Sequence, residues 1–86
     1  MIYLKYSDPE TNTHKFYTLL IQKDLFGDWS LLRQWGRIGT KGQTKIDTFA
    51  SYEEAQAALS KIKQAKLRKG YSFKLSELVT VSQAIE

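Results

Sequence analysis

The stretch Trp-Gly-Arg-Ile-Gly-Thr-Lys-Gly-Gln, residues 35–43, joins the end of a strand to a glycine-rich turn. Residues two apart in a strand point to the same face of a sheet, so Trp35, Arg37 and Arg33 are predicted to stand side by side. The glycines that follow supply the positive φ angles that a tight hairpin needs. The stretch therefore predicts an antiparallel hairpin that carries an aromatic ring between two guanidinium groups.

The rest of the N-terminal half reads as further strands of the same sheet. Turn residues around the single proline, Pro9, and around Gly27 separate runs that are rich in β-branched and aromatic residues. Short strands at this spacing indicate an antiparallel meander. The predicted strands cover residues 2–6, 15–23, 29–38 and 43–49.

Beyond residue 50 the apolar period becomes that of a helix. Ser51 and Glu54 have the spacing of a capping box, apolar residues follow at helical intervals, and Gly70 stands where a glycine ends a helix. These signals predict a helix of about 17–18 residues. For residues 71–81 a short strand and an irregular docked tail both remain open, and residues 81–86 are expected to fray.

Strands followed by one helix indicate an α+β fold. We expect an antiparallel sheet of four to five strands with one long helix packed on one face, the other face being left to solvent or a ligand. At 86 residues, the chain is expected to be one domain over 1–86, with a core over about 1–75 and a tail over 76–86.

Composition excludes several classes of protein. The chain has no cysteine and one histidine, His14, which argues against disulfides, thiolate metal sites and multi-histidine sites. No apolar run approaches the roughly 20 residues of a membrane span, and the N-terminus lacks the features of a signal peptide. We expect a cytoplasmic protein with no metal, no cofactor, no membrane partner and no small-molecule substrate. No nucleophile–base–acid set can be assembled, which predicts that the chain is not an enzyme.

Positive charge is concentrated in one part of the chain, whose net charge is +4. The segment from Lys61 to Lys74 holds six cations and no acid, whereas the rest holds seven cations against nine acids. This segment is either a solvated helix face with a favourable cationic C-terminus or a contact for a polyanion.

The residues of the opening stretch also have simpler structural explanations. Trp35 can be a core residue, but two neighbouring guanidinium groups are costly to bury unpaired, which favours a partly exposed face. Gly36 can mark a bulge or a close approach of another segment. Gly39 and Gly42 are hairpin glycines or, with Lys41 between them, a phosphate-binding nest. The run is not a P-loop, because a strand rather than a helix follows it.

The Trp-Gly-Arg triplet, with Gly39-Thr40 and Lys41-Gly42-Gln43, resembles the signature of the WGR domain family. Arg33, Phe49 before the capping serine, Glu-Glu-Ala at 53–55 and Lys-Gly-Tyr at 69–71 fit the same pattern. The resemblance covers roughly residues 1–75.

This family is best known from the DNA-damage-activated poly(ADP-ribose) polymerases, in which the domain helps to bind broken DNA and passes that signal to the catalytic part. The resemblance implies that Trp35 stacks on a sugar at a strand end and that Arg37 contacts nucleic acid and neighbouring domains. This chain shows no catalytic or zinc-finger domain, and its connection over 39–49 is compact, as in short bacterial members. The resemblance therefore supports nucleic-acid contact more directly than break sensing.

We therefore predict a non-enzymatic module that binds nucleic acid, DNA or RNA, and above all DNA ends, nicks or distorted sites. The ring would stack and the cations would hold phosphate. One alternative is a protein–protein adaptor that uses the same Trp/Arg face. A second is a regulator whose basic helix binds acidic protein or RNA independently of Trp35. The predicted nucleic-acid-binding residues are Trp35, Arg37, Arg33, Lys41, Gly39 and Lys45.

Overall fold

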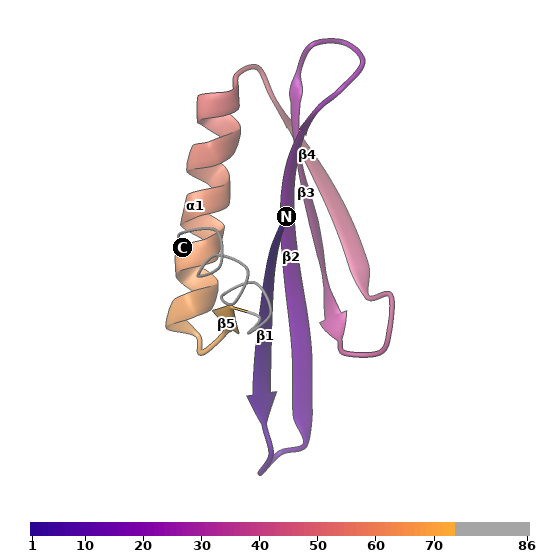
Figure 1. The fold of residues 1–86 in the computed structure, drawn as a ribbon, viewed down its shortest axis with the longest axis vertical. Coiled ribbons are helices and arrows are strands. Elements are labelled where there is room, and N and C mark those ends of the chain that lie inside the picture. Colours follow the sequence, from indigo (N-terminus) through magenta and orange to yellow (C-terminus); the bar gives the residue numbers. More distant parts are fainter. Residues whose placement is uncertain (74–86) are drawn as a thin grey trace, which may run out of the picture.

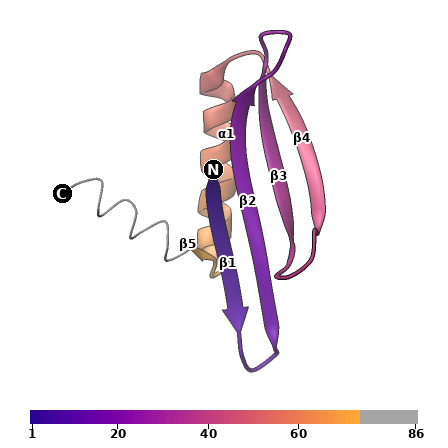
Figure 2. The same cartoon turned by 45° about the vertical axis from the view of Figure 1, so that its right-hand side comes forward.

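The computed structural model describes residues 1–73 and shows a five-stranded antiparallel sheet with one helix on one face (Figures 1 and 2). The strand order is β4-β3-β2-β1-β5, so the first four strands form a meander of neighbours. The helix α1 packs across β2, β3 and β4. The elements are β1 (Ile2–Asp8), β2 (Thr13–Lys23), β3 (Trp29–Arg37), β4 (Gln43–Phe49), α1 (Tyr52–Arg68) and β5 (Ser72–Phe73).

The predicted α+β fold is confirmed, with small shifts at the strand ends. The strand β2 begins at Thr13 rather than at residue 15, and β3 ends at Arg37 rather than at residue 38. Between the two alternatives for the segment after α1, residues 72–73 form a short strand that pairs with β1. The remaining residues, 74–86, lie outside the described residues, and with them the predicted tail over 76–86 and the fraying expected over 81–86.

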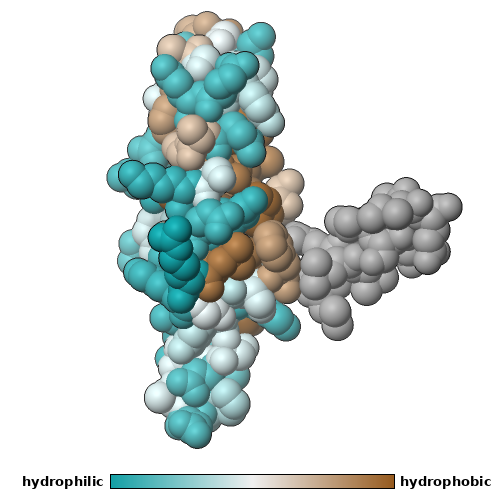
Figure 3. All heavy atoms as spheres, turned by 90° about the vertical axis from the view of Figure 1, so that its left-hand side faces the viewer, coloured by the Kyte–Doolittle hydropathy of each residue, from teal (hydrophilic) through white to brown (hydrophobic). Residues whose placement is uncertain are grey.

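The core lies between the sheet and α1. Leu4, Leu19 and Leu31 are fully buried and come from the three central strands, and Leu59 packs on them from the helix. Burying side chains of this size stabilises a fold by about 1.5–3 kcal/mol each. Seen from the helix side, hydrophilic residues cover most of the surface, and hydrophobic ones show between them (Figure 3). This is the pattern of an amphipathic helix that faces its core on one side only.

Both ends of α1 are fixed by the signals that the sequence carries. The Glu54 backbone N–H donates to the Ser51 side-chain oxygen over 3.2 Å, which caps the first turn. At the other end, Gly70 has a φ of +105°. The Gly70 N–H donates to the Leu67 carbonyl and the Tyr71 N–H donates to the Lys66 carbonyl, which is a Schellman motif. This motif turns the chain back on the last turn of the helix.

Candidate nucleic-acid interface

The strand β3 places three of the predicted residues on one face. Pairing with β2 runs without interruption from Lys15 opposite Arg37 to Lys23 opposite Trp29, so no bulge at Gly36 shifts the phase. Arg33, Trp35 and Arg37 therefore share a face with Leu31, which is buried under α1. The predicted common face is confirmed, and it is the helix-covered face of the sheet.

Trp35 is half-buried and belongs to a group of four aromatic side chains, which we call the aromatic row. Its ring stacks beside that of Tyr17, the residue opposite on β2, with centroids 5.7 Å apart and planes at 17°. The Tyr71 ring meets Tyr17 edge-on at 6.4 Å and lies 5.6 Å from the Tyr6 ring. The row thus crosses the sheet beside the C-terminal end of α1. Its members are Tyr6, Tyr17, Trp35 and Tyr71.

The end of the helix brings lysines onto this row. The Schellman motif bonds Tyr71 to the backbone of Lys66, and the Lys66 Nζ lies 5.7 Å from the Tyr71 ring centroid and 4.7 Å from that of Tyr17. A Cβ at Gly70 would come within 3.1 Å of the Tyr6 ring, so the turn approaches β1 closely. Gly70 therefore serves both the positive φ of the turn and the packing of the row.

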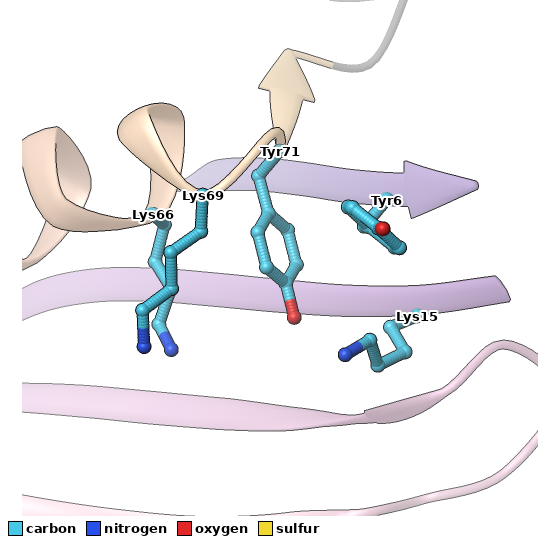
Figure 4. Close-up of a pocket in the computed structure, with 5 residues that line it drawn as sticks. All are labelled: Tyr6, Lys15, Lys66, Lys69 and Tyr71. Carbon is cyan, nitrogen blue, oxygen red and sulfur yellow. The ribbon is translucent and has the colours of Figure 1, made fainter. Parts of the chain in front are cut away.

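A cavity of about 330 Å³ opens between these side chains (Figure 4). The Lys15 Nζ lies 5.1 Å from the Tyr6 ring centroid, on the side of the cavity opposite the helix. The amino groups of Lys66 and Lys69 point the same way as the Tyr71 hydroxyl (Figure 4). We call this cavity the lysine pocket. It is lined by Tyr6, Lys15, Lys66, Lys69 and Tyr71.

The positive charges in the lysine pocket repel one another. Partial burial, followed by the positive charges of Lys69, Lys15 and Arg33, lowers the pKa of Lys66. Burial, with smaller contributions from two neighbouring tyrosines, raises the pKa of Tyr71, so its hydroxyl stays a hydrogen-bond donor to higher pH. Within residues 1–73 no carboxylate forms an ion pair with any of the three lysines. An anion in the pocket would relieve their repulsion.

Arg33 is held differently from these lysines. Its Nη2 lies 2.9 Å from the Asp47 Oδ2, and its side chain is only 18% exposed. Burial lowers its pKa, but interactions with Tyr17 and Asp47 outweigh burial and raise the pKa overall. Its buried Nε has no hydrogen-bond partner in the described part of the chain. Arg33 is therefore a partly buried, paired cation at the edge of the aromatic row.

Two further predicted cations, Arg37 and Lys45, lie on the same face of the sheet. Arg37 is exposed, lies opposite Lys15 across the sheet, and donates from Nη2 to the Asn12 carbonyl over 3.4 Å. Lys45 is exposed and lies directly opposite Arg33 on β4. Arg37 therefore lies next to a lysine of the pocket, and Lys45 adds a positive charge on the same face at the edge of the sheet.

The hairpin over residues 38–42 bends toward the other face. A Cβ on Gly36 would point away from the helix and come within 2.7 Å of the Gly42 Cα, so the hairpin folds over Gly36. Gln34, on that same face, donates from Nε2 to the Lys41 carbonyl over 2.7 Å. Gly39 lines a separate hollow of about 320 Å³ with Tyr3 and Phe16. Gly39 thus does not join Trp35 in one site, and Gly36 is explained by close packing.

Sequence reasoning missed most of the lysine pocket. Lys66 and Lys69 stood in the basic segment, and Lys-Gly-Tyr at 69–71 was interpreted as a helix stop, but nothing linked them to Tyr6 and Lys15. The available signal was strand alternation, which places Tyr6, Lys15 and Tyr17 on the face of Trp35 once the register is known.

Over residues 1–73 there is no group of three or more histidine, cysteine, aspartate or glutamate side chains that could hold a metal ion. Within the same residues, no helix has the length and hydrophobicity to cross a membrane.

Comparison with known proteins identifies the family of this chain. The model of the WGR domain family matches residues 1–77. The uncharacterized protein y4dW of Sinorhizobium fredii is 40% identical over 70 residues, which are 81% of this chain and 34% of that protein. Human protein mono-ADP-ribosyltransferase PARP3 is 29% identical over 69 residues, 80% of this chain and 13% of that protein. The chain thus spans about a third or less of the length of these two relatives. With the family signature at residues 35–43 and the family model matched over most of its length, the chain belongs to the WGR domain family.

Proposed function

We propose that this WGR domain is a non-enzymatic module that binds nucleic acid, in the first place DNA at ends, nicks or distorted sites. The observation that carries the proposal is the lysine pocket beside the aromatic row. Three lysines converge there without a carboxylate partner in the described residues, and the pKa of Lys66 is lowered partly by its cationic neighbours. A phosphate supplies the missing negative charge, and aromatic rings next to it offer surfaces for stacking on sugars or bases.

The family supports the same proposal. The WGR domains of DNA-damage-activated poly(ADP-ribose) polymerases help to bind broken DNA, and PARP3 is one of the relatives of this chain. On that basis Trp35 stacks on a sugar or base through its exposed part, and Arg37 holds phosphate. Lys45 adds positive charge from β4. Lys41 stands on the hairpin that bends toward the other face, so its contribution is less direct. Arg33 contributes less directly, because its guanidinium already donates to Asp47.

A protein–protein adaptor is the second candidate function. It is favoured by the composition of the same face, in which half-buried Trp35 and the neighbouring tyrosines lie next to Arg33. Tryptophan, tyrosine and arginine are the residues that most often anchor protein interfaces. The two functions differ in their response to salt, because a phosphate contact releases counterions and a stacked aromatic contact does not.

The test is fluorescence anisotropy of labelled duplex DNA, intact, nicked or with a 5′-phosphorylated end, over a series of salt concentrations. The variants are Trp35→Ala, Arg37→Ala and Lys66→Ala, each checked for folding by circular dichroism. Each lost phosphate contact should reduce the salt slope by about 1. Lys5→Ala is the matched control, because Lys5 is exposed on the face of the sheet away from α1.

Preference for the discontinuous DNA that is lost in the three variants and kept in Lys5→Ala supports the proposal. Absence of binding at low salt, or equal loss in Lys5→Ala, rejects this surface as a DNA reader. In that case the adaptor becomes the better explanation.

A further inference from the structure

The outer edge of β4 is left open in the described part of the chain. The strand has seven residues and pairs with β3 on one side only, whereas β5 pairs with part of the other edge of the sheet. It contains no proline, no glycine and no interruption of its pairing register. A regular exposed edge of this length is a template for a further strand.

We propose that β4 pairs antiparallel with β4 of a second copy of this chain, about a twofold axis through Ile46. Ile46 is the central residue of Gln43–Phe49, so this axis brings all seven residues of each strand into register. The axis stands perpendicular to the sheet, and the two five-stranded sheets join into one with both helices on the same face. The lysine pockets of both copies then open on one side of the dimer.

Apolar residues on the face away from the helix favour this pairing. Leu20, Leu32 and Ile46 lie opposite one another on β2, β3 and β4 and form a row across the sheet. The row stops at the edge, where Ile46 is 61% exposed. In the dimer the partner's Ile46 lies directly opposite and continues the row, which removes apolar surface from water.

Charged residues of β4 on the helix-covered face favour one pairing register over its neighbours. With the axis at Ile46, Lys45 faces the partner's Asp47, and Asp47 faces the partner's Lys45, giving two ion pairs. The Asp47 Oδ2 already accepts from Arg33, which leaves Oδ1 for the partner's lysine. An axis at residue 45 or 47 would instead set two lysines or two aspartates opposite each other, which is unfavourable. The strand is therefore complementary to itself in one register.

An interface made by one strand pair is small, so the dimer is expected to be weak and to depend on concentration. Sedimentation velocity of the full chain over a wide concentration range measures this equilibrium. Lys45→Glu and Asp47→Lys each set two like-charged pairs across the axis and should each weaken self-association by about tenfold. An equimolar mixture of the two variants should recover the dimer, since opposite charges then face each other again.

The same equilibrium tests the apolar row. Ile46→Lys places two charges at the axis and should abolish the dimer. Gln22→Lys is its matched control, because Gln22 is exposed on the same face but on β2, away from the edge. Circular dichroism and thermal unfolding confirm that each variant is folded before its mass is interpreted.

Cysteine cross-linking gives a second, independent readout, because the chain has no cysteine of its own. Position 46 faces itself across the axis with Cβ atoms about 4.5–5.5 Å apart, so Ile46→Cys should form a disulfide dimer under mild oxidation. Thr44→Cys should not, because the two copies of that position lie roughly 14 Å apart along the strands. A mixture of Thr44→Cys and Thr48→Cys should cross-link, since those positions face each other.

Three results would overturn the proposal. They are a monomer at every concentration, a dimer that survives Ile46→Lys, and cross-linking of Thr44→Cys as fast as that of Ile46→Cys. None of these measurements depends on nucleic acid, so they judge the dimer separately from the proposed function.

Discussion

The amino group of Lys66 lies 4.7 Å from the centroid of the Tyr17 ring, so the last turn of the helix is joined to the central strand β2 by a cation–π contact. Tyr17 in turn stacks beside Trp35, the tryptophan of the family signature. Tyr17 therefore contacts both Lys66, from the C-terminal half of the chain, and Trp35. This relationship makes Lys66 the residue on which the chemistry of the site can be tested most directly.

Nucleic-acid binding should depend on pH through Lys66. Its pKa is lowered by burial and by Lys69, Lys15 and Arg33, and a bound phosphate favours the charged amine and raises that pKa again. Affinity should be constant below the lowered pKa and fall as pH rises through it, with uptake of a proton on binding in that window. Isothermal titration calorimetry in buffers of different ionisation enthalpy measures this uptake. Lys66→Arg, which keeps its charge, should abolish it.

The same shift has a consequence for stability in the absence of ligand. Between the lowered pKa of Lys66 and the ordinary lysine value, the unfolded chain holds more protons than the folded one, so this residue makes stability rise with pH. Tyr71, whose pKa is raised, acts in the opposite direction once unfolded tyrosine begins to ionise. Chemical denaturation of Lys66→Met should show a weaker rise over this range than the unaltered chain. An unchanged pH profile would contradict the assignment to Lys66.

Replacing Gly42 should lower the stability of the fold far more than replacing Gly39, the other glycine of the same hairpin. Gly42 has a φ of +66°, and a Cβ there would overlap the Trp35 carbonyl oxygen. Gly42→Ala should therefore lower the free energy of unfolding by about 3 kcal/mol or more. Gly39→Ala should cost only about 1–2 kcal/mol, because its Cβ would meet no atom within 4 Å and only the backbone is strained. Denaturant titration compares them, and equal losses would show that the close approach is unimportant.

The stability of the turn between β2 and β3 should depend on Asp24 and not on the exposed apolar residues of that turn. The Asp24 Oδ1 accepts from the Phe26 and Asp28 backbone N–H groups, each over 2.9 Å. Asp24→Ala should lower stability by about 1–2 kcal/mol, since both bonds are lost. Leu25 is 99% exposed, so Leu25→Ser should change stability by less than about 0.5 kcal/mol. Thermal unfolding of the two variants tests this difference, and a larger loss for Leu25→Ser would refute it.

The ion pair between Arg33 and Asp47 should stabilise the fold modestly. Asp47→Asn keeps the shape of the side chain but leaves the guanidinium of Arg33 without its counter-charge. Because both side chains keep some contact with water, at 18% and 35% exposure, the expected loss is about 1 kcal/mol. Denaturant titration at low and high salt measures it. The loss should shrink as salt rises, and a loss that ignores salt would point to packing instead.

The fold could be predicted from sequence because its signals are local. The alternation in the strands, the cap at Ser51 and the stop at Gly70 each depend on neighbouring residues, and each appears in the structure. Strand ends moved by one or two residues, since pairing with a neighbour decides where a strand ends. The common face of Trp35, Arg33 and Arg37 was predictable for the same local reason.

The lysine pocket could not be predicted in this way. It requires the position of the C-terminal end of α1 over the sheet, and that depends on how the helix packs on Leu4, Leu19 and Leu31. The direction in which the hairpin bends was also hidden, because the contact between Gly36 and Gly42 is a matter of backbone approach. Sequence alone thus identified the face of the sheet but not the set of residues gathered on it.

The lysine pocket draws its residues from positions far apart in the chain, with Tyr6 and Lys15 near the start and Lys66, Lys69 and Tyr71 about fifty residues or more further along. During vectorial synthesis the meander of β1 to β4 can pair before the helix has emerged, because each of those strands neighbours the next. The pocket is therefore among the last features to be completed. A ligand seated in it joins the first strand to the end of the helix, so its occupancy opposes the separation of those two segments.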